Sequence, residues 1–137
     1  MRKFILFLLT ALTPLLGISQ SKSITHHAEQ ALANYQQTYQ LSSDQQQQVL
    51  QIQQQHFQKE AELSNLKQTD LNRYLSKKIA LRKMTERSVF RLLNESQQAI
   101  FTKKQQERAQ KATALQTKLK KQGASNTEIK QALLDLK

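Results

Sequence analysis

Apolar side chains in the chain beyond residue 20 recur mainly at intervals of three and four residues, as on one face of an α-helix. No stretch alternates apolar and polar residues for long enough to predict a β-strand. Glycine occurs once in this part of the chain, at Gly123, and proline is absent. Residues that favour helices dominate the rest. The pattern predicts an all-α protein.

The helix boundaries are predicted from residues that cap helix ends. Serine or asparagine precedes three of the expected helices, and Gly123 follows the fourth. Glycine is the residue that most easily adopts the left-handed conformation past a helix end. Since the second and third segments could form one bent helix, we expect four to five helices. The expected segments are Thr25–Gln40, Ser42 to about Lys67, Thr69 or Asp70 to Leu92, Glu95–Gln122, and a short helix after Ser125.

One short motif, a leucine followed by a helix cap and a glutamine, occurs twice. It reads LSSDQ from Leu41 to Gln45 and LNESQ from Leu93 to Gln97. A serine or asparagine at the N-cap accepts a hydrogen bond from the third helical residue, whose glutamine side chain can reach back to the N–H of the cap. The spacing predicts capping boxes at Ser42 and Asn94.

The two leucines of the motif need a buried position of their own. A leucine just before an N-cap often packs on an apolar residue at the fourth helical position. That position holds Gln46 and Gln98 here, so no such contact is expected. We therefore expect Leu41 and Leu93 to be buried at a junction between helices.

The N-terminal residues are typical of a secretory signal. Arg2 and Lys3 precede an apolar run over residues 4–18, and Gly17 and Ser19 supply small residues at the two positions that a signal peptidase inspects. We expect cleavage after residue 19, leaving one helical domain over residues 20–137. The alternative is a retained membrane anchor, but the run is shorter than the roughly 20 apolar residues that span a bilayer and is interrupted by Pro14.

Charge and composition limit the partners and the shape. The formal charge of +11 falls to +9 without Arg2 and Lys3. In an exported protein this charge favours acidic protein segments, anionic lipid or cell-wall polymer over nucleic acid. Cysteine is absent, so no disulfide braces the fold. Only 29 apolar residues larger than alanine lie beyond residue 19, few for a compact globule, so we expect an extended shape that pairs with a second copy.

The segment from Gln36 to Gln58 holds 12 of the 23 glutamines. One interpretation is a low-complexity segment that is prone to aggregate. The other is a neutral face of a helix, because Val49, Ile52 and Phe57 interrupt the tract at spacings that a helix can bury. The second interpretation fits the helical pattern on both sides.

The paired LSSDQ and LNESQ motifs, in an exported, basic, helical chain, resemble the paired Leu-Thr-x-x-Gln motifs of the Spy/CpxP family of periplasmic proteins. The resemblance covers essentially all of residues 20–137, although Ser42 and Asn94 stand where the family usually has threonine. It implies an elongated antiparallel helical hairpin that forms a curved homodimer in the periplasm. It also implies an ATP-independent chaperone or a modulator of envelope stress responses.

The third expected helix carries the densest run of positive charge, with apolar residues between the cations. Such a surface can attract unfolded chains electrostatically and hold them through apolar contacts. The alternative is a charged face that is merely solvated. The expected client-binding residues are Arg73, Lys77, Ile79, Lys83, Met84, Arg87 and Arg91.

Little in the sequence indicates metal binding or catalysis. His26 and His27 are adjacent, and neither they nor His56 have the i, i+4 spacing of helical metal ligands. They are weak candidates for a site between subunits and are better read as surface histidines. No nucleophile–base pair, phosphate loop or pair of carboxylates in a cleft is evident, so we expect neither an enzyme nor a cofactor.

Two further functions remain open. The basic face could dock on an acidic sensor domain of an envelope-stress kinase, which would make the protein a regulatory adaptor. A Skp-like exported chaperone is also basic and helical, but such chains add a small β body, and strand signals are missing here. The leading hypothesis is a periplasmic chaperone of unfolded envelope proteins, with no nucleic-acid partner and no stable membrane anchor after cleavage.

Overall fold

The computed structural model describes residues 16–136, and all the regular structure in this range is α-helical, as predicted. The helices are joined by short turns, and no strand occurs among these residues. Their bounds are α1 Leu16–Tyr39, α2 Ser43–Glu62, α3 Ser64–Thr69, α4 Leu71–Phe90, α5 Glu95–Lys121 and α6 Asn126–Asp135.

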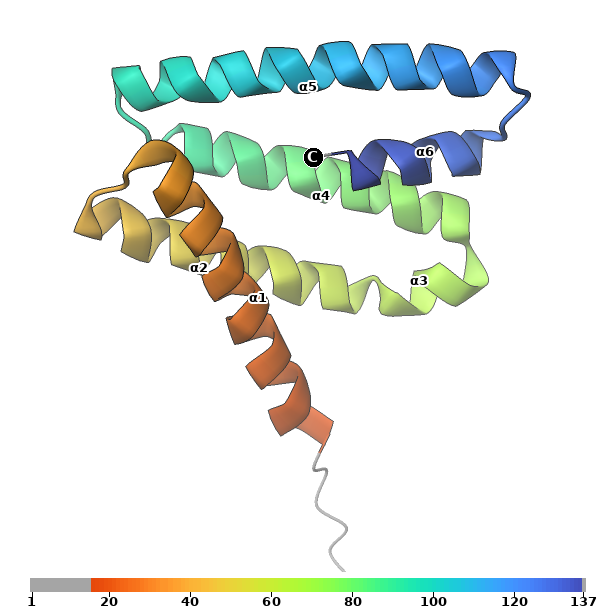
Figure 1. The fold of residues 1–137 in the computed structure, drawn as a ribbon. Coiled ribbons are helices and arrows are strands. Elements are labelled where there is room, and N and C mark those ends of the chain that lie inside the picture. Colours follow the sequence, from red (N-terminus) through yellow and green to blue (C-terminus); the bar gives the residue numbers. More distant parts are fainter. Residues whose placement is uncertain (1–15, 137) are drawn as a thin grey trace, which may run out of the picture.

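The helices form an open arrangement of rods that run back and forth (Figure 1). The path along α2 and α3 returns along α4, and α5 then runs antiparallel to α4. Helix α1 packs on α2 and crosses it obliquely, whereas α6 folds back from the end of α5 and packs on α4. Helix α4 therefore lies between α2 on one side and α5 with α6 on the other.

The number of helices differs from the expected four to five, because the described chain has six. The expected second segment is divided at Leu63 into α2 and α3. Ser64 and Asn65 follow this residue, and both favour helices less than the glutamines and lysines around them. Helix α1 also begins at Leu16, well before the expected Thr25.

The predicted signal peptide lies largely outside the described residues, which begin at residue 16. Residues 16–19 form the first turn of α1. No helix within residues 16–136 is both long enough and apolar enough to cross a membrane.

Three predicted helix ends are confirmed by their capping hydrogen bonds or backbone conformation. The Asp70 carboxylate accepts from the N–H of Arg73 at 2.9 Å and caps α4. The side chain of Ser125 accepts from the N–H of Glu128 and caps α6. Gly123 has a φ of +76° and ends α5, with the N–H of Ala124 donating to the carbonyl of Leu119 at 3.0 Å. This bond is typical of a glycine-terminated helix.

The main core lies where the junction of α1 and α2 meets the junction of α4 and α5. Its buried residues come from four helices and from the two turns that join them. Half-buried side chains from α1, α2, α4 and the α4–α5 turn pack around them. The buried set is Tyr39, Leu41, Val49, Val89, Leu93 and Phe101.

Candidate functional site

Both predicted capping boxes are present. The Ser42 hydroxyl accepts from the N–H of Gln45 at 3.3 Å, and the N–H of Ser42 donates to Oε1 of Gln45 at 2.9 Å. The Asn94 side chain accepts from the N–H of Gln97 at 3.0 Å, and the N–H of Asn94 donates to Oε1 of Gln97 at 2.9 Å. Each box satisfies backbone groups that a helix start leaves without a partner inside the helix.

The fold brings the two boxes together, which the sequence did not predict. The side-chain amides of Gln45 and Gln97 lie against each other and exchange hydrogen bonds. The second donor of Gln45 goes to the carbonyl of Leu92 at 2.8 Å, and that of Gln97 goes to the carbonyl of Tyr39 at 3.0 Å. Each glutamine thereby ties the start of its own helix to a residue shortly before the other helix. The sequence feature that could have indicated this pairing is the glutamine at the same position of both motifs.

The residues after the boxes also repeat their contacts. Gln46 donates to the carbonyl of Leu41 at 3.0 Å, and Gln98 donates to the carbonyl of Leu93 at 3.0 Å. At both starts, the fourth helical residue therefore forms a hydrogen bond with the backbone of the leucine before the cap, where other helices often have an apolar contact. Leu41 and Leu93 are buried in the same core, as predicted for a junction between helices.

The residues predicted to bind clients lie mostly on the outer face of α4. All five cations of the set, Arg73, Lys77, Lys83, Arg87 and Arg91, have exposed side chains. Met84 lies between these cations in the sequence, and its side chain is 61% exposed, more than those of Leu71 and Ile100. Ile79 is half-buried and contributes less to this surface. We call the five cations and Met84 the α4 basic face.

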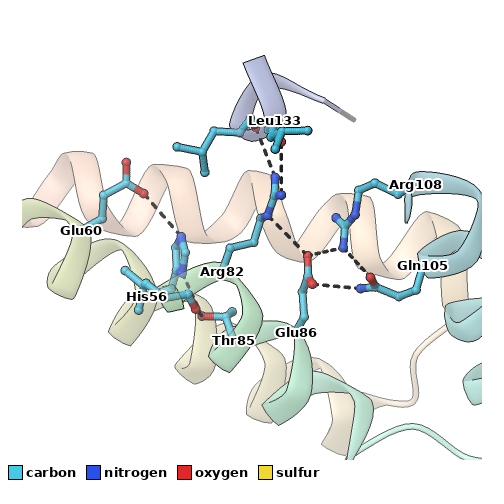
Figure 2. Close-up of polar contacts among 10 residues, drawn as sticks. His56, Glu60, Arg82, Thr85, Glu86, Gln105, Arg108 and Leu133 are labelled. Carbon is cyan, nitrogen blue, oxygen red and sulfur yellow. Dashed lines mark hydrogen bonds and ion pairs between the residues drawn. The ribbon is translucent and has the colours of Figure 1, made fainter. Parts of the chain in front are cut away.

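Two acidic residues, Glu86 of α4 and Glu60 of α2, lie in the interfaces between helices (Figure 2). Glu86 of α4 lies 2.6 Å from Nη2 of Arg108 on α5 and 4.0 Å from Nε of Arg82. Gln105 of α5 donates to the other carboxylate oxygen of Glu86 at 2.9 Å. This network joins α4 to α5 and uses the negative charge of Glu86 internally.

Glu60 of α2 plays the same part at the contact with α4. Its carboxylate lies 2.6 Å from Nζ of Lys78 and 3.4 Å from Nε2 of His56. The hydrogen bond from His56, against the opposing effect of burial and with help from Lys78, lowers the pKa of Glu60 to about 2. Burial opposes the charged form of Lys78, but its bond to Glu60 prevails and raises the pKa of Lys78.

The expectation of surface histidines holds for His26 and His27 but not for His56, which is half-buried between α2 and α4. His56 contacts the Thr85 hydroxyl at 2.9 Å and Glu60 on its other side, so it joins α2 to α4 (Figure 2). His26 and His27 are exposed on α1, and the ring of His27 lies 5.4 Å from that of Phe57. Within the described range, no group of three or more His, Cys, Asp or Glu side chains is placed to hold a metal ion.

A cavity of about 520 Å³ opens between α1, α4 and α5. Tyr35, Tyr39 and Phe101 give it an aromatic lining, and Lys104 and Lys111 lie at its edge. Burial is the main cause that raises the pKa of Tyr35 to about 12. The sequence did not predict this site, because its residues come from helices that are distant in the chain.

Searches for a matching protein-family model, curated protein or solved structure found none for this chain.

Proposed function

We propose that the protein is a non-catalytic, ATP-independent chaperone that binds unfolded envelope proteins on the α4 basic face. The observation that carries this proposal is the separation of charge across α4. Its outer face presents five exposed cations around an exposed methionine, whereas Glu86 is turned inward and paired. Positive charge accelerates encounter with chains that carry acidic segments, and small apolar contacts prolong the complex.

The setting of this activity is part of the same proposal. A cleaved signal over residues 1–19 would place the protein in the periplasm, and membership of the Spy/CpxP family would account for the paired cap motifs.

The large apolar side chains that are most exposed, Leu71, Met84 and Ile100, lie at separate positions on α4 and α5. We propose a homodimer of elongated helical hairpins, which sedimentation at several concentrations would detect as a change in mass.

An aggregation assay tests the chaperone function directly. We expect the purified protein, near equimolar with an unfolding client, to reduce light scattering, and more strongly at low than at moderate salt because exposed charges are screened. Unchanged scattering at both salt concentrations would reject the chaperone proposal.

A charge-reversal pair tests the assigned surface. Lys83→Glu with Arg87→Glu should slow client capture while helicity by circular dichroism stays unchanged. The matched control is Lys103→Glu with Lys120→Glu, which alters the charge equally at exposed positions on α5. Equal capture rates for both variants would contradict the assignment to α4.

The alternative function is a regulatory adaptor for an envelope-stress kinase. The observation in its favour is that four of the five cations lie along α4 and the fifth, Arg91, caps its C-terminal end, an ordered array of charge that suits a folded acidic partner. An adaptor would form a saturable complex of fixed stoichiometry with the sensor domain and would leave the aggregation of unrelated clients unchanged. Titration of both kinds of partner therefore separates the two functions.

A further inference from the structure

The cavity between α1, α4 and α5 has the size and lining of a site for an aromatic side chain. Its volume of about 520 Å³ falls within the range of small-molecule sites in proteins. The ring of Tyr39 lies 6.0 Å from that of Phe101, and Tyr35 is 5.8 Å from Tyr39. Rings at such separations pack on one another, so the three side chains form one continuous aromatic wall of the cavity.

One wall of the cavity is built rigidly. Arg108 of α5 donates to Glu86 at 2.6 Å and to Oε1 of Gln105 at 2.8 Å, and Gln105 donates back to Glu86. All three residues line the cavity, and Figure 2 shows them meeting between α4 and α5. Because the Glu86 carboxylate is neutralised within this network, its charge repels an incoming anion only weakly.

The remaining charges at the cavity favour an anion. Lys104 and Lys111 are exposed on α5, and neither forms an ion pair with another of the described residues. Glu107 is the one further carboxylate in the lining, so two such lysines face a single acid. Lys104 and Lys111 are seven residues apart, two turns of one helix face, and can contact charges on both sides of a bound ring.

We propose that this cavity binds an aromatic side chain flanked by carboxylates, within an exposed segment of an unfolded protein. The inference rests on the proposed chaperone function and adds to the α4 basic face a second, more selective point of attachment. The aromatic ring packs against the wall formed by Tyr35, Tyr39 and Phe101, and the neighbouring carboxylates pair with Lys104 and Lys111. The cavity thus selects segments in which acidic and aromatic residues alternate.

The protein contains no tryptophan, which allows a direct binding experiment. The probe is an acetylated, amidated peptide with the sequence Gly-Asp-Trp-Asp-Gly, whose tryptophan emission is then the only one in solution. We expect a saturable blue shift when the full chain is titrated into this peptide. A peptide with lysines in place of both aspartates should bind at least about tenfold more weakly, because it reverses the attraction to the lysines.

Two variants locate the binding. Lys104→Glu with Lys111→Glu should raise the dissociation constant at least about tenfold by reversing two charges at the cavity. Lys103→Glu with Lys120→Glu changes the net charge equally at exposed positions that do not line the cavity. It should change the dissociation constant by no more than about twofold, because salt screens long-range attraction. Thr38→Phe fills the cavity without changing charge and should abolish the blue shift.

Each possible result decides the question. Absence of a blue shift, a blue shift that persists in Thr38→Phe, equal affinity for the acidic and basic peptides, or equal affinity of the two charge-reversal variants would overturn the cavity proposal. Such a result would leave the chaperone function standing if the protein still suppressed client aggregation and Lys83→Glu with Arg87→Glu still slowed capture. Peptide binding without any suppression of aggregation would instead show that the proposed function is wrong and that the cavity serves another purpose.

Discussion

Gln45 and Gln97 form a reciprocal pair of side-chain amides at the point where four helices meet. Nε2 of Gln45 donates to Oε1 of Gln97 at 2.9 Å, and Nε2 of Gln97 donates to Oε1 of Gln45 at 3.2 Å. Each Oε1 also accepts from the N–H of its own helix cap, and each Nε2 also donates to a backbone carbonyl across the junction. Both amides therefore use their full capacity of two donated and two accepted bonds.

Replacement of Gln97 by glutamate should destabilise the fold strongly. Gln97 is 6% exposed, and a carboxylate there can donate no hydrogen bond to Gln45 or to the carbonyl of Tyr39. We expect Gln97→Glu to lower the free energy of unfolding by about 3 kcal/mol at neutral pH, since a buried group that loses its partners and gains a charge is costly.

The loss should become smaller in mild acid, where the new carboxyl group protonates. Chemical denaturation at two pH values would measure both effects. Gln106→Glu, at an exposed position on the same helix, should change stability by less than about 0.5 kcal/mol. Similar values for the two variants would show that the amide pair contributes little.

Truncation of the motif leucine should cost far more than truncation of an exposed leucine. Leu93 is 5% exposed within the main core, whereas Leu71 at the start of α4 is 44% exposed. We expect Leu93→Ala to cost about 2 to 4 kcal/mol and Leu71→Ala less than about 1 kcal/mol, because only the first leaves a cavity. Thermal unfolding of both variants, monitored by circular dichroism, would measure the difference, and equal melting temperatures would contradict the position of the core.

The Glu60 carboxylate should make stability depend on pH in acid. Its pKa is lowered to about 2 in the folded protein, so the ionised group stabilises the fold. This contribution is complete above the ordinary value of 4.5 and is lost as the pH falls towards 2. We expect this contribution to amount to roughly 1 to 3 kcal/mol. Values at the lower end are favoured by the partial solvent exposure of Glu60, which weakens its charge interactions.

The variant Glu60→Gln removes the titrating group and should flatten the acid part of the stability curve. Denaturant titrations at several pH values between 2 and 6 would measure the difference between the proteins, which should shrink as the pH falls. Glu62→Gln, at an exposed position two residues away, is the control. A constant difference across this range would show that Glu60 does not titrate as proposed.

Arg82 should hold the C-terminal end of α6 against α4. Its guanidinium donates to the carbonyls of Leu133 and Leu134 at 3.3 and 3.2 Å (Figure 2). The variant Arg82→Met keeps the apolar stem but leaves these carbonyls without that donor. We expect amide exchange in α6 to accelerate about fivefold to tenfold, equivalent to about 1 kcal/mol.

Exchange in α2 and α5 should change less, because their contacts with α4 do not depend mainly on Arg82. The control is Arg87→Met, which lies on the exposed side of the same helix. Hydrogen exchange followed by mass spectrometry resolves the helices separately. Acceleration in α6 of the same size in both variants would reject the role of Arg82.

The helix boundaries that depend on neighbouring residues were predictable. Ser42, Asn94, Asp70 and Ser125 cap helices through bonds to residues three positions away, so their role is visible in a short stretch of sequence. Gly123 likewise ends α5 through its own backbone conformation. The break at Leu63 was not predicted, because no glycine or proline marks it.

Local patterns also predicted that Leu41 and Leu93 are buried, but not that they share one core with Tyr39 and Phe101. The burial follows from the lack of an apolar partner four positions into each helix. The shared core requires α1, α2, α4 and α5 to meet, and nothing within one helix specifies which other helix it contacts. The cavity at this meeting point was hidden for the same reason.

The order of residues was therefore sufficient for the helical class, for most helix ends and for the basic outer side of α4, since each depends on contacts within a few turns of one chain segment. Tertiary packing alone set the pairing of Gln45 with Gln97, the inward direction of Glu86 and the return of α6 onto α4. These contacts join residues far apart in the chain. They form only when helices bury their apolar sides together, and which helices pack together depends on residues throughout the chain.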